Sequence, residues 1–268
     1  MRKSNNLGKI IDQYLKSLNS DYIINSYPKS GRTWICFMLG FYINELYKSN
    51  IPLDEINLLN NSKFYNLLRK KIYFTHFGRP QFLHHKYQFL IPLKILNIKK
   101  CVFIARNPLN VIDSFYSQYH YREAKFRSSA ILSTDFDEFV LGNKGGISSI
   151  IKYYNRVYQN SLNNKNHLIL KYEDFIEDSE SQLIKLISFF DLKISNQLVI
   201  KSIEMSNKSN MAKLEKLGKL SKKHFGGSGN SAKVRNSKGL FKRSKNSSLL
   251  LNKCQNIIDI ELNKYYKY

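Results

Sequence analysis

Short apolar runs alternate along this chain with longer segments of helical periodicity, and this alternation limits the fold more than any other feature of the sequence. Parallel strands need long connections, usually helices, and a parallel sheet is then covered on both faces. We therefore predict an α/β fold, a three-layer sandwich around a central and mainly parallel sheet, in a single domain over residues 1–268. The predicted strands are residues 21–27, 71–75, 100–105 and 167–171.

After several of the predicted strands, a polar turn leads into a segment whose apolar residues have helical spacing. A helix is predicted over residues 32–48, a second begins at Pro108, and a last one covers roughly residues 249–265. Residues 217–247 differ, because they are rich in Gly, Ser, Lys and Asn and lack apolar periodicity. This segment is either a solvated loop or a basic lid over an anionic ligand.

The charge of the chain is strongly positive, with 43 Lys and Arg against 20 Asp and Glu, a formal net charge of +23. Such a surface attracts nucleic acid, anionic lipid and phosphorylated small molecules alike. The chain is also rich in Lys, Asn and Ile, which an AT-biased genome produces without selection for a ligand. Charge alone therefore does not choose among these partners.

The sequence predicts a cytoplasmic protein without a membrane span. Three cysteines (Cys36, Cys101 and Cys254) are far apart in sequence, which fits a reducing compartment better than a disulfide framework. The N-terminal segment has no sustained apolar stretch of the kind that signal peptides carry. The longest apolar run, residues 34–43, is about half of what a membrane helix requires.

Polar residues suited to chemistry stand at the end of each predicted strand. In open parallel sheets, ligands bind beyond the carboxyl ends of the strands. The four segments should therefore meet at one edge of the sheet and form one site. They are residues 27–34, 75–76, 106–108 and 172–174.

The first of these segments has the features of an anion-binding turn. A strand, a turn containing Gly31 and a helix N-terminus present backbone N–H groups and the positive end of the helix dipole. Ser30 and Thr33 add hydroxyl groups, and Lys29 adds a positive charge. The pattern GxxxxGK[ST] and an acidic pair for Mg²⁺ are both absent. The turn is therefore predicted to hold a phosphate-like group without a metal, and an ordinary strand-to-helix turn is the alternative.

Four segments resemble the cytosolic-type, PAPS-dependent sulfotransferase family (PAPS is 3′-phosphoadenosine 5′-phosphosulfate). YPKSGRTW at residues 27–34 resembles the family's 5′-phosphosulfate loop YPKSGTTW, with Arg32 in place of Thr. RNPLNVIDSFYSQYHY at 106–121 resembles its 3′-phosphate segment. KYEDF at 171–175 and SNKSNMAKLEKLG at 206–218 match two further segments in the family's order. The resemblance covers most of the chain and implies a P-loop-NTPase-like sulfotransferase architecture with PAPS as co-substrate and no metal.

The resemblance also implies roles for particular residues. Lys29 would stabilise charge on the bridging oxygen as PAP, the desulfated nucleotide, leaves. Arg106 and Ser114 would bind the 3′-phosphate. The remaining implied contacts are Ser30, Gly31, Arg32 and Thr33 with the 5′-phosphate, Trp34, Tyr172 and Ser206 with the adenine, and Arg235 with the 3′-phosphate through a C-terminal lid that this chain keeps only in part.

A general base is needed to take the proton of the acceptor, and histidine is the usual choice because its pKa lies near neutral. His76 follows a predicted strand, and THFGRP resembles the family's KTHLP segment with its catalytic histidine. His84 and His85 are the next candidates. The predicted reaction is transfer of a sulfuryl group from PAPS to a hydroxyl or amine, in line, with His76 and Lys29 as catalytic residues.

Two other functions remain open at this stage, a metal-dependent nucleotide kinase and a non-catalytic nucleic-acid binder. The first lacks its phosphate-loop pattern, and the second lacks zinc-ligand spacing or an RNA-binding aromatic signature. A small-molecule, lipid or carbohydrate acceptor is expected, and nucleic acid is not. Aromatic residues suited to an acceptor pocket are Phe77, Phe82, Tyr116, Tyr119 and Tyr121.

Overall fold

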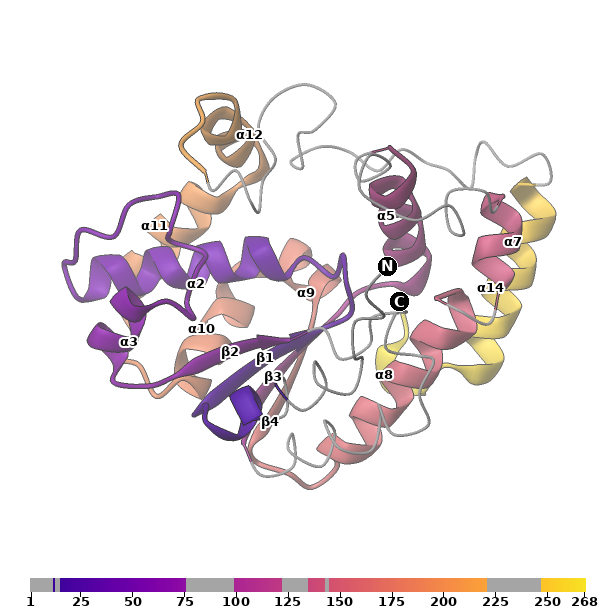
Figure 1. Cartoon of the computed structure of the whole chain (residues 1–268), viewed down its shortest axis with the longest axis horizontal. Helices are drawn as coiled ribbons and strands as arrows, with labels where there is room; N and C mark the ends of the chain where they lie inside the picture. Colours follow the sequence, from indigo (N-terminus) through magenta and orange to yellow (C-terminus); the bar gives the residue numbers. More distant parts are fainter. Residues whose placement is uncertain (1–11, 13–14, 76–98, 122–134, 143–144, 221–246) are drawn as a thin grey trace, which may run out of the picture.

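A four-stranded parallel sheet forms the centre of the computed structural model, which describes residues 12, 15–75, 99–121, 135–142, 145–220 and 247–268 (Figure 1). The strand order is β2-β1-β3-β4, and every neighbouring pair runs parallel. The predicted parallel α/β sandwich is thereby confirmed. The strands are β1 (Tyr22–Ser26), β2 (Ile72–Thr75), β3 (Lys100–Ala105) and β4 (His167–Lys171).

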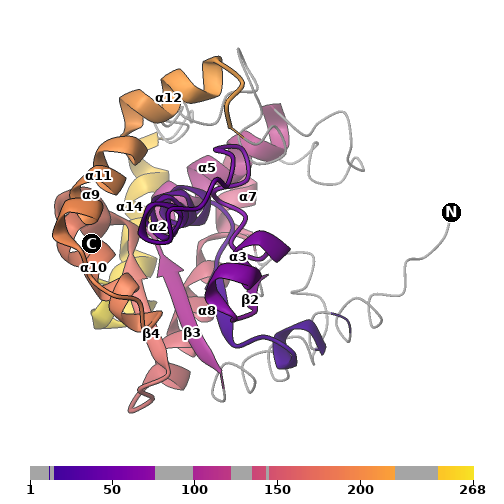
Figure 2. The same cartoon turned by 90° about the vertical axis from the view of Figure 1, so that its left-hand side faces the viewer.

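Helices connect the strands and cover both faces of the sheet (Figures 1 and 2). Between β1 and β2 lie α2 (Arg32–Leu46) and α3 (Ser62–Leu68). Between β3 and β4 lie α5 (Pro108–Tyr121), α7 (Phe136–Leu141) and α8 (Ile147–Ser161). After β4 follow α9 (Tyr172–Glu177), α10 (Ser179–Phe189), α11 (Asn196–Ser206), α12 (Lys208–Lys216), α14 (Ser247–Glu261) and the 3₁₀ helix η5 (Lys264–Tyr266).

Two hydrophobic cores lie on opposite faces of the sheet, because successive side chains of a strand point to opposite faces. Ile24 and Val102 face the first core, which holds α2, α10 and α11. Ile23 and Phe103 face the second, which holds α5, α7, α8 and α14. Burial on both faces explains why these strands read as continuous apolar runs rather than as alternating ones.

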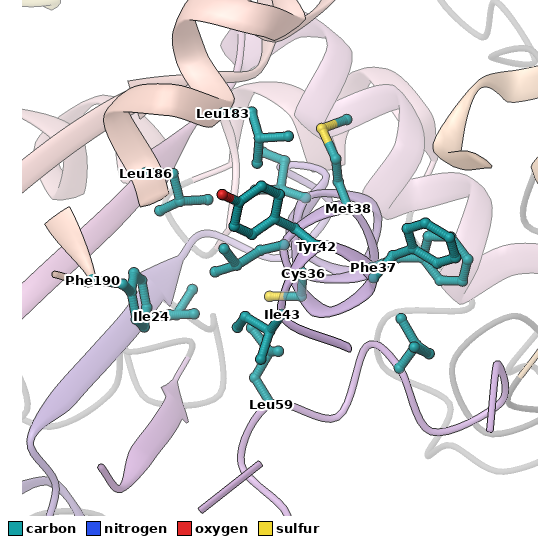
Figure 3. Packing of buried hydrophobic residues seen from close by; sticks show 14 of the residues in the cluster. Ile24, Cys36, Phe37, Met38, Tyr42, Ile43, Leu59, Leu183, Leu186 and Phe190 are labelled. Atoms are coloured by element: carbon teal, nitrogen blue, oxygen red, sulfur yellow. The ribbon is translucent and has the colours of Figure 1, made fainter. Parts of the chain in front are cut away.

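Helix α2 is buried almost all round, and residues 35–43 are all buried. Figure 3 shows Cys36, Met38 and Tyr42 of this helix packed among residues of β1 and α10. The one hydroxyl among them is satisfied, since Tyr42 Oη donates to Lys193 O at 2.6 Å and accepts from Ser195 N at 2.9 Å. A helix of this kind is held by packing on every side rather than by an amphipathic pattern.

Element boundaries differ from the sequence predictions by a few residues. The first strand covers residues 22–26 rather than 21–27, and the first helix ends at Leu46, just before Lys48 takes a φ of 47°. The last helix starts two residues earlier than predicted and ends at Glu261. A separate 3₁₀ helix follows, with Asn263 as its N-cap. The third and fourth strands match their predicted ranges. Most of the predicted lid, residues 221–246, lies outside the described residues.

Gly40 tests whether packing or intrinsic propensity dominates in α2. An added Cβ would lie 1.9 Å from Ile56 O, so Gly40→Ala should lower the free energy of unfolding by about 1–3 kcal/mol through overpacking. Helix propensity alone predicts the reverse, a gain of about 1 kcal/mol. Urea denaturation monitored by far-UV circular dichroism distinguishes the two, and an unchanged or higher midpoint would contradict the close approach seen here.

Candidate functional site

The carboxyl ends of β1 and β3 form the point where the direction of the strand order reverses. From β1 the chain enters α2 on one face, and from β3 it enters α5 on the other (Figure 1). Helices that diverge in this way leave a crevice between adjacent strand ends, where ligands of open α/β sheets bind. The predicted site segments that follow β1, β3 and β4 therefore lie at one edge, as expected.

Residues 27–33, here called the phosphate loop, join β1 to α2 in an unusual backbone conformation. Lys29 has a φ of 76° and Gly31, the N-cap of α2, a φ of 86°. A positive φ is uncommon for a residue with a side chain and is found at sites where the surroundings enforce it. At Gly31 an added Cβ would lie 2.3 Å from Tyr172 Cδ2. The loop backbone thus lies directly against the Tyr172 ring, and only glycine fits.

Arg106 connects the end of β3 to this loop. Its Nη1 donates to Lys29 O at 2.9 Å, and its guanidinium lies 4.5 Å from the centre of the Tyr172 ring. Its Nε is buried without a hydrogen-bond partner among the described residues. A guanidinium with a spare donor beside a helix N-terminus suits a bidentate anionic ligand such as phosphate.

An aromatic wall stands next to the phosphate loop. Trp34 meets the edges of Tyr172 and Phe175, with ring centres 5.4 and 6.2 Å apart, and its Nε1 donates to Ser206 O at 2.6 Å. Three residues predicted to lie near an adenine are thus adjacent. The hydroxyl of Ser206 donates to Ile203 O at 3.2 Å, so it is engaged within α11 in this structure.

Arg32, the departure from the family's loop, directs its side chain to the end of β2. Its Nη1 donates to Thr75 O at 2.8 Å, and its guanidinium lies 5.2 Å from the centre of the Phe74 ring. Arg32 therefore braces β2 against the phosphate loop. Thr33 is partly exposed in the first turn of α2 and Ser30 is buried.

Glu173 lies in the predicted site segment 172–174, where it was given no role, and Tyr154 was not predicted to belong to the site at all. Glu173 Oε1 accepts from Asn107 N at 3.0 Å, while burial raises the pKa of this carboxyl. Tyr154 Oη contacts both backbone polar groups of Arg106. The position of Glu173 directly after a predicted strand indicated that it could belong to the site. The sequence around Tyr154 indicates only an aromatic residue on the buried side of a helix.

The remaining predicted residues lie on α5 or outside the described residues. Ser114 is partly exposed on α5, two turns beyond Arg106. Tyr116 was expected in an acceptor pocket, but it belongs to the second core, where its ring lies 5.0 and 5.4 Å from Phe136 and Phe139. Outside the described residues lie His76, His84, His85 and Arg235, with Phe77 and Phe82, and the side chains of Tyr119 and Tyr121.

Within the described parts of the chain, no group of three or more His, Cys, Asp or Glu residues could hold a metal ion. Over the same ranges, no helix is long and apolar enough to span a membrane.

Comparison with known proteins assigns the chain to a family. Residues 19–263 match the model of the sulfotransferase domain, so the chain belongs to the sulfotransferase family. It is 27% identical over 199 residues to the amine sulfotransferase of Oryctolagus cuniculus, covering 72% of this chain and 63% of the relative. It is also 27% identical over 240 residues to cytosolic sulfotransferase 14 of Arabidopsis thaliana, covering 76% and 64%. These relatives identify the family as the cytosolic type, and the chain spans slightly less than two thirds of their length.

A solved structure shares the fold of this chain. A retinol dehydratase crystallised with androsterone and the inactive cofactor PAP superposes with a TM-score of 0.63 at 16% identity. The match covers 98% of this chain and 87% of that protein. At this identity the likeness establishes the shared fold, and the predicted P-loop-like architecture is confirmed.

Gly31→Ala tests the contact between the phosphate loop and Tyr172. The new Cβ must displace the ring, and Trp34, the only tryptophan of the chain, packs on that ring. We expect a changed Trp34 emission spectrum in the folded protein and a loss of stability of about 2–4 kcal/mol, from overpacking together with left-handed strain.

Gly218→Ala is the matched control. Gly218 also has a positive φ, 66°, but its added Cβ would meet no described residue within 4 Å. It should lose only about 1–2 kcal/mol to backbone strain and leave the Trp34 emission unchanged. Equal spectra for both variants would show that Gly31 does not contact Tyr172 in solution.

Proposed function

We propose that this protein transfers a sulfuryl group from PAPS to a hydroxyl or amine of a small acceptor and releases PAP. The observation that carries the proposal is the 2.9 Å bond from Arg106 Nη1 to Lys29 O. It brings the two segments expected to grip the 5′- and 3′-phosphates side by side, in a chain that belongs to the sulfotransferase family.

The described residues fit a doubly phosphorylated adenosine. The 5′-phosphate would bind at the phosphate loop, where the first turn of α2 leaves N–H groups without intrahelical acceptors. The 3′-phosphate would bind Arg106, whose Nε has no partner among the described residues, and the hydroxyl of Ser114. The adenine would lie at the wall formed by Trp34 and Tyr172. Ser206 would complete this contact by turning its hydroxyl away from Ile203.

The chemistry of the transfer suits side-chain cations. In sulfuryl transfer, as in phosphoryl transfer, nucleophile and leaving group lie roughly in line, and catalysis rests on positioning and charge stabilisation. Lys29 would stabilise the charge that develops on the bridging oxygen. The formal net charge of +23 also favours capture of an anionic nucleotide. We propose His76 as the general base, and Arg235 with the basic segment 217–247 as a lid over the 3′-phosphate.

The acceptor is proposed to be a small molecule with a hydroxyl or amine. Relatives support this class, since one is named an amine sulfotransferase and the similar retinol dehydratase structure holds androsterone. We propose that the protein acts in the cytoplasm. The name of the plant relative, cytosolic sulfotransferase 14, supports this compartment.

Transfer of radiolabelled sulfate from PAPS to a panel of alcohols and amines tests the proposal. Turnover of at least one acceptor, together with a rise in melting temperature when PAP is added, is the expected result. Turnover of ATP and Mg²⁺ without response to PAPS would instead favour a nucleotide kinase. Salt-dependent binding of random DNA, without stabilisation by PAP, would favour a nucleic-acid binder.

His76→Ala separates catalysis from nucleotide binding. Loss of a general base typically lowers turnover by about 10²–10⁴-fold, while the affinity for PAP should stay within about twofold of wild type. Both are measured on the same preparation by sulfate transfer and by Trp34 fluorescence. Turnover near the wild-type value would remove His76 from the mechanism.

Arg106→Lys tests recognition of the 3′-phosphate. A lysine keeps the charge but loses the planar fork that binds phosphate with two N–H groups. The Kd for PAP should therefore rise by about 10- to 100-fold, and the Kd for 5′-AMP, which lacks the 3′-phosphate, much less. Arg156→Lys, at an exposed position on α8, is the control and should change neither constant. Equal weakening of both nucleotides would contradict the assignment.

A further inference from the structure

Tyr154 reaches the candidate site from α8, the helix layer that covers the second core. Its side chain is 0% exposed, yet its hydroxyl accepts from Arg106 N at 3.1 Å and donates to Arg106 O at 3.0 Å. A tyrosine hydroxyl has one proton and two lone pairs, so both bonds form at once. A single side-chain oxygen thus satisfies both backbone polar groups of Arg106.

These bonds stand where the sheet ends. The pairing of β1 with β3 reaches its last pair at Ser26 and Ile104, and that of β3 with β4 ends at Ala105. Arg106, the next residue, has left the ladder, and shielded backbone groups need other partners. Tyr154 supplies them, and so fixes the direction in which Arg106 leaves the strand.

The same hydroxyl also touches the phosphate loop. Ser30 Oγ lies 3.4 Å from Tyr154 Oη. Because the Tyr154 proton is given to Arg106 O, Ser30 is the donor in this contact. Tyr154 is therefore a common neighbour of the two segments that the resemblance assigns to the two phosphates of PAPS.

Neighbouring rings hold Tyr154 in place. Its ring centre lies 5.4 Å from that of Phe103 and 5.2 Å from that of Tyr266, and Tyr266 Oη donates to Tyr154 O at 3.2 Å. A ring packed on two sides, with its backbone also tied, has little freedom to swing away. The position of the hydroxyl is consequently set by the folded core.

We propose that Tyr154 is a positioning residue of the donor site, whose hydroxyl fixes Arg106 relative to the phosphate loop. The two phosphates of PAPS are separated by the ribose, so their anchors must keep a matching separation. Tyr154 thereby favours a nucleotide with both phosphates over one with the 5′-phosphate alone. This inference rests on the proposed function, and Tyr154 itself contacts no substrate in it.

Tyr154→Phe removes the hydroxyl and keeps the ring. We expect the Kd for PAP to rise by about tenfold, and that for 5′-AMP by less than about twofold, measured on the full chain by Trp34 fluorescence. Tyr153→Phe is the matched control, because Tyr153 is the adjacent residue, is equally buried and bonds through its hydroxyl to Asn25 Nδ2 instead. Tyr153→Phe should reproduce any general loss of stability without changing the ratio of the Kd for PAP to the Kd for 5′-AMP.

A double-mutant cycle identifies the route of the effect. If Tyr154 acts through Arg106, then Tyr154→Phe should change the ratio of constants by less than about twofold in an Arg106→Lys background, since coupled residues are not additive. Full additivity, or the same ratio in Tyr154→Phe as in Tyr153→Phe, would overturn the proposal. Absence of PAP binding by the wild-type chain would instead refute the proposed function itself.

Tyr266→Phe provides an independent variant should Tyr154→Phe fail to fold. It leaves the Tyr154 hydroxyl in place and removes the bond that holds the backbone of Tyr154. The ratio of the Kd for PAP to the Kd for 5′-AMP should rise by about two- to fourfold. An unchanged ratio in a folded Tyr266→Phe protein would count against the proposal.

Discussion

The bond between the Arg106 guanidinium and the carbonyl oxygen of Lys29 crosses the sheet edge just beyond the last paired residues of β1 and β3. The other residues of the site are connected to this bond through a series of contacts. The guanidinium lies on the Tyr172 ring, that ring packs against Gly31 and Trp34, and Trp34 is bonded in turn to the end of α11. Each contact limits the position of the next. The separation of the two strand ends therefore sets the geometry of the aromatic wall and of the helix N-terminus together.

Two polar groups at this edge differ from the Tyr42 hydroxyl of the first core. In that core the Tyr42 hydroxyl both donates and accepts, and so it has a full set of partners. At the edge, Arg106 Nε and Glu173 Oε2 are buried without hydrogen-bond partners among the described residues. Opposite charges stand close together here, yet burial still raises the pKa of Glu173 above its usual value. Unsatisfied buried groups are uncommon in native proteins, and the two at this edge support a role for it in holding a ligand.

The four strands, their parallel arrangement and the convergence of three strand ends could all be predicted from the sequence, because buried strands and connecting helices leave strong apolar patterns. Side-chain directions could not. Arg32 occupies a phosphate-loop position, but its guanidinium donates to a backbone oxygen at the end of β2. Every residue has a backbone oxygen, so the sequence does not indicate which one the guanidinium will bind. The packing of Tyr116 in the second core was not predicted, because the core-facing side of α5 depends on contacts with α7 that become visible only in three dimensions. Tyr154 was missed for a related reason, since its helix shows only the periodicity of a core element.

The strand order has a consequence for how the protein folds. Each strand pairs with a neighbour that is distant in sequence, as Tyr22 with Ile72 and with Lys100, or Cys101 with His167. Closing such long loops costs entropy before any pairing energy is recovered, and sheets built from distant pairs form slowly. The central strand β1 acquires its second neighbour only when β3 docks. During synthesis, one edge of β1 therefore stays unpaired until β3 has been made. How long the backbone groups of that edge remain exposed depends on how soon the later segments are synthesised and dock.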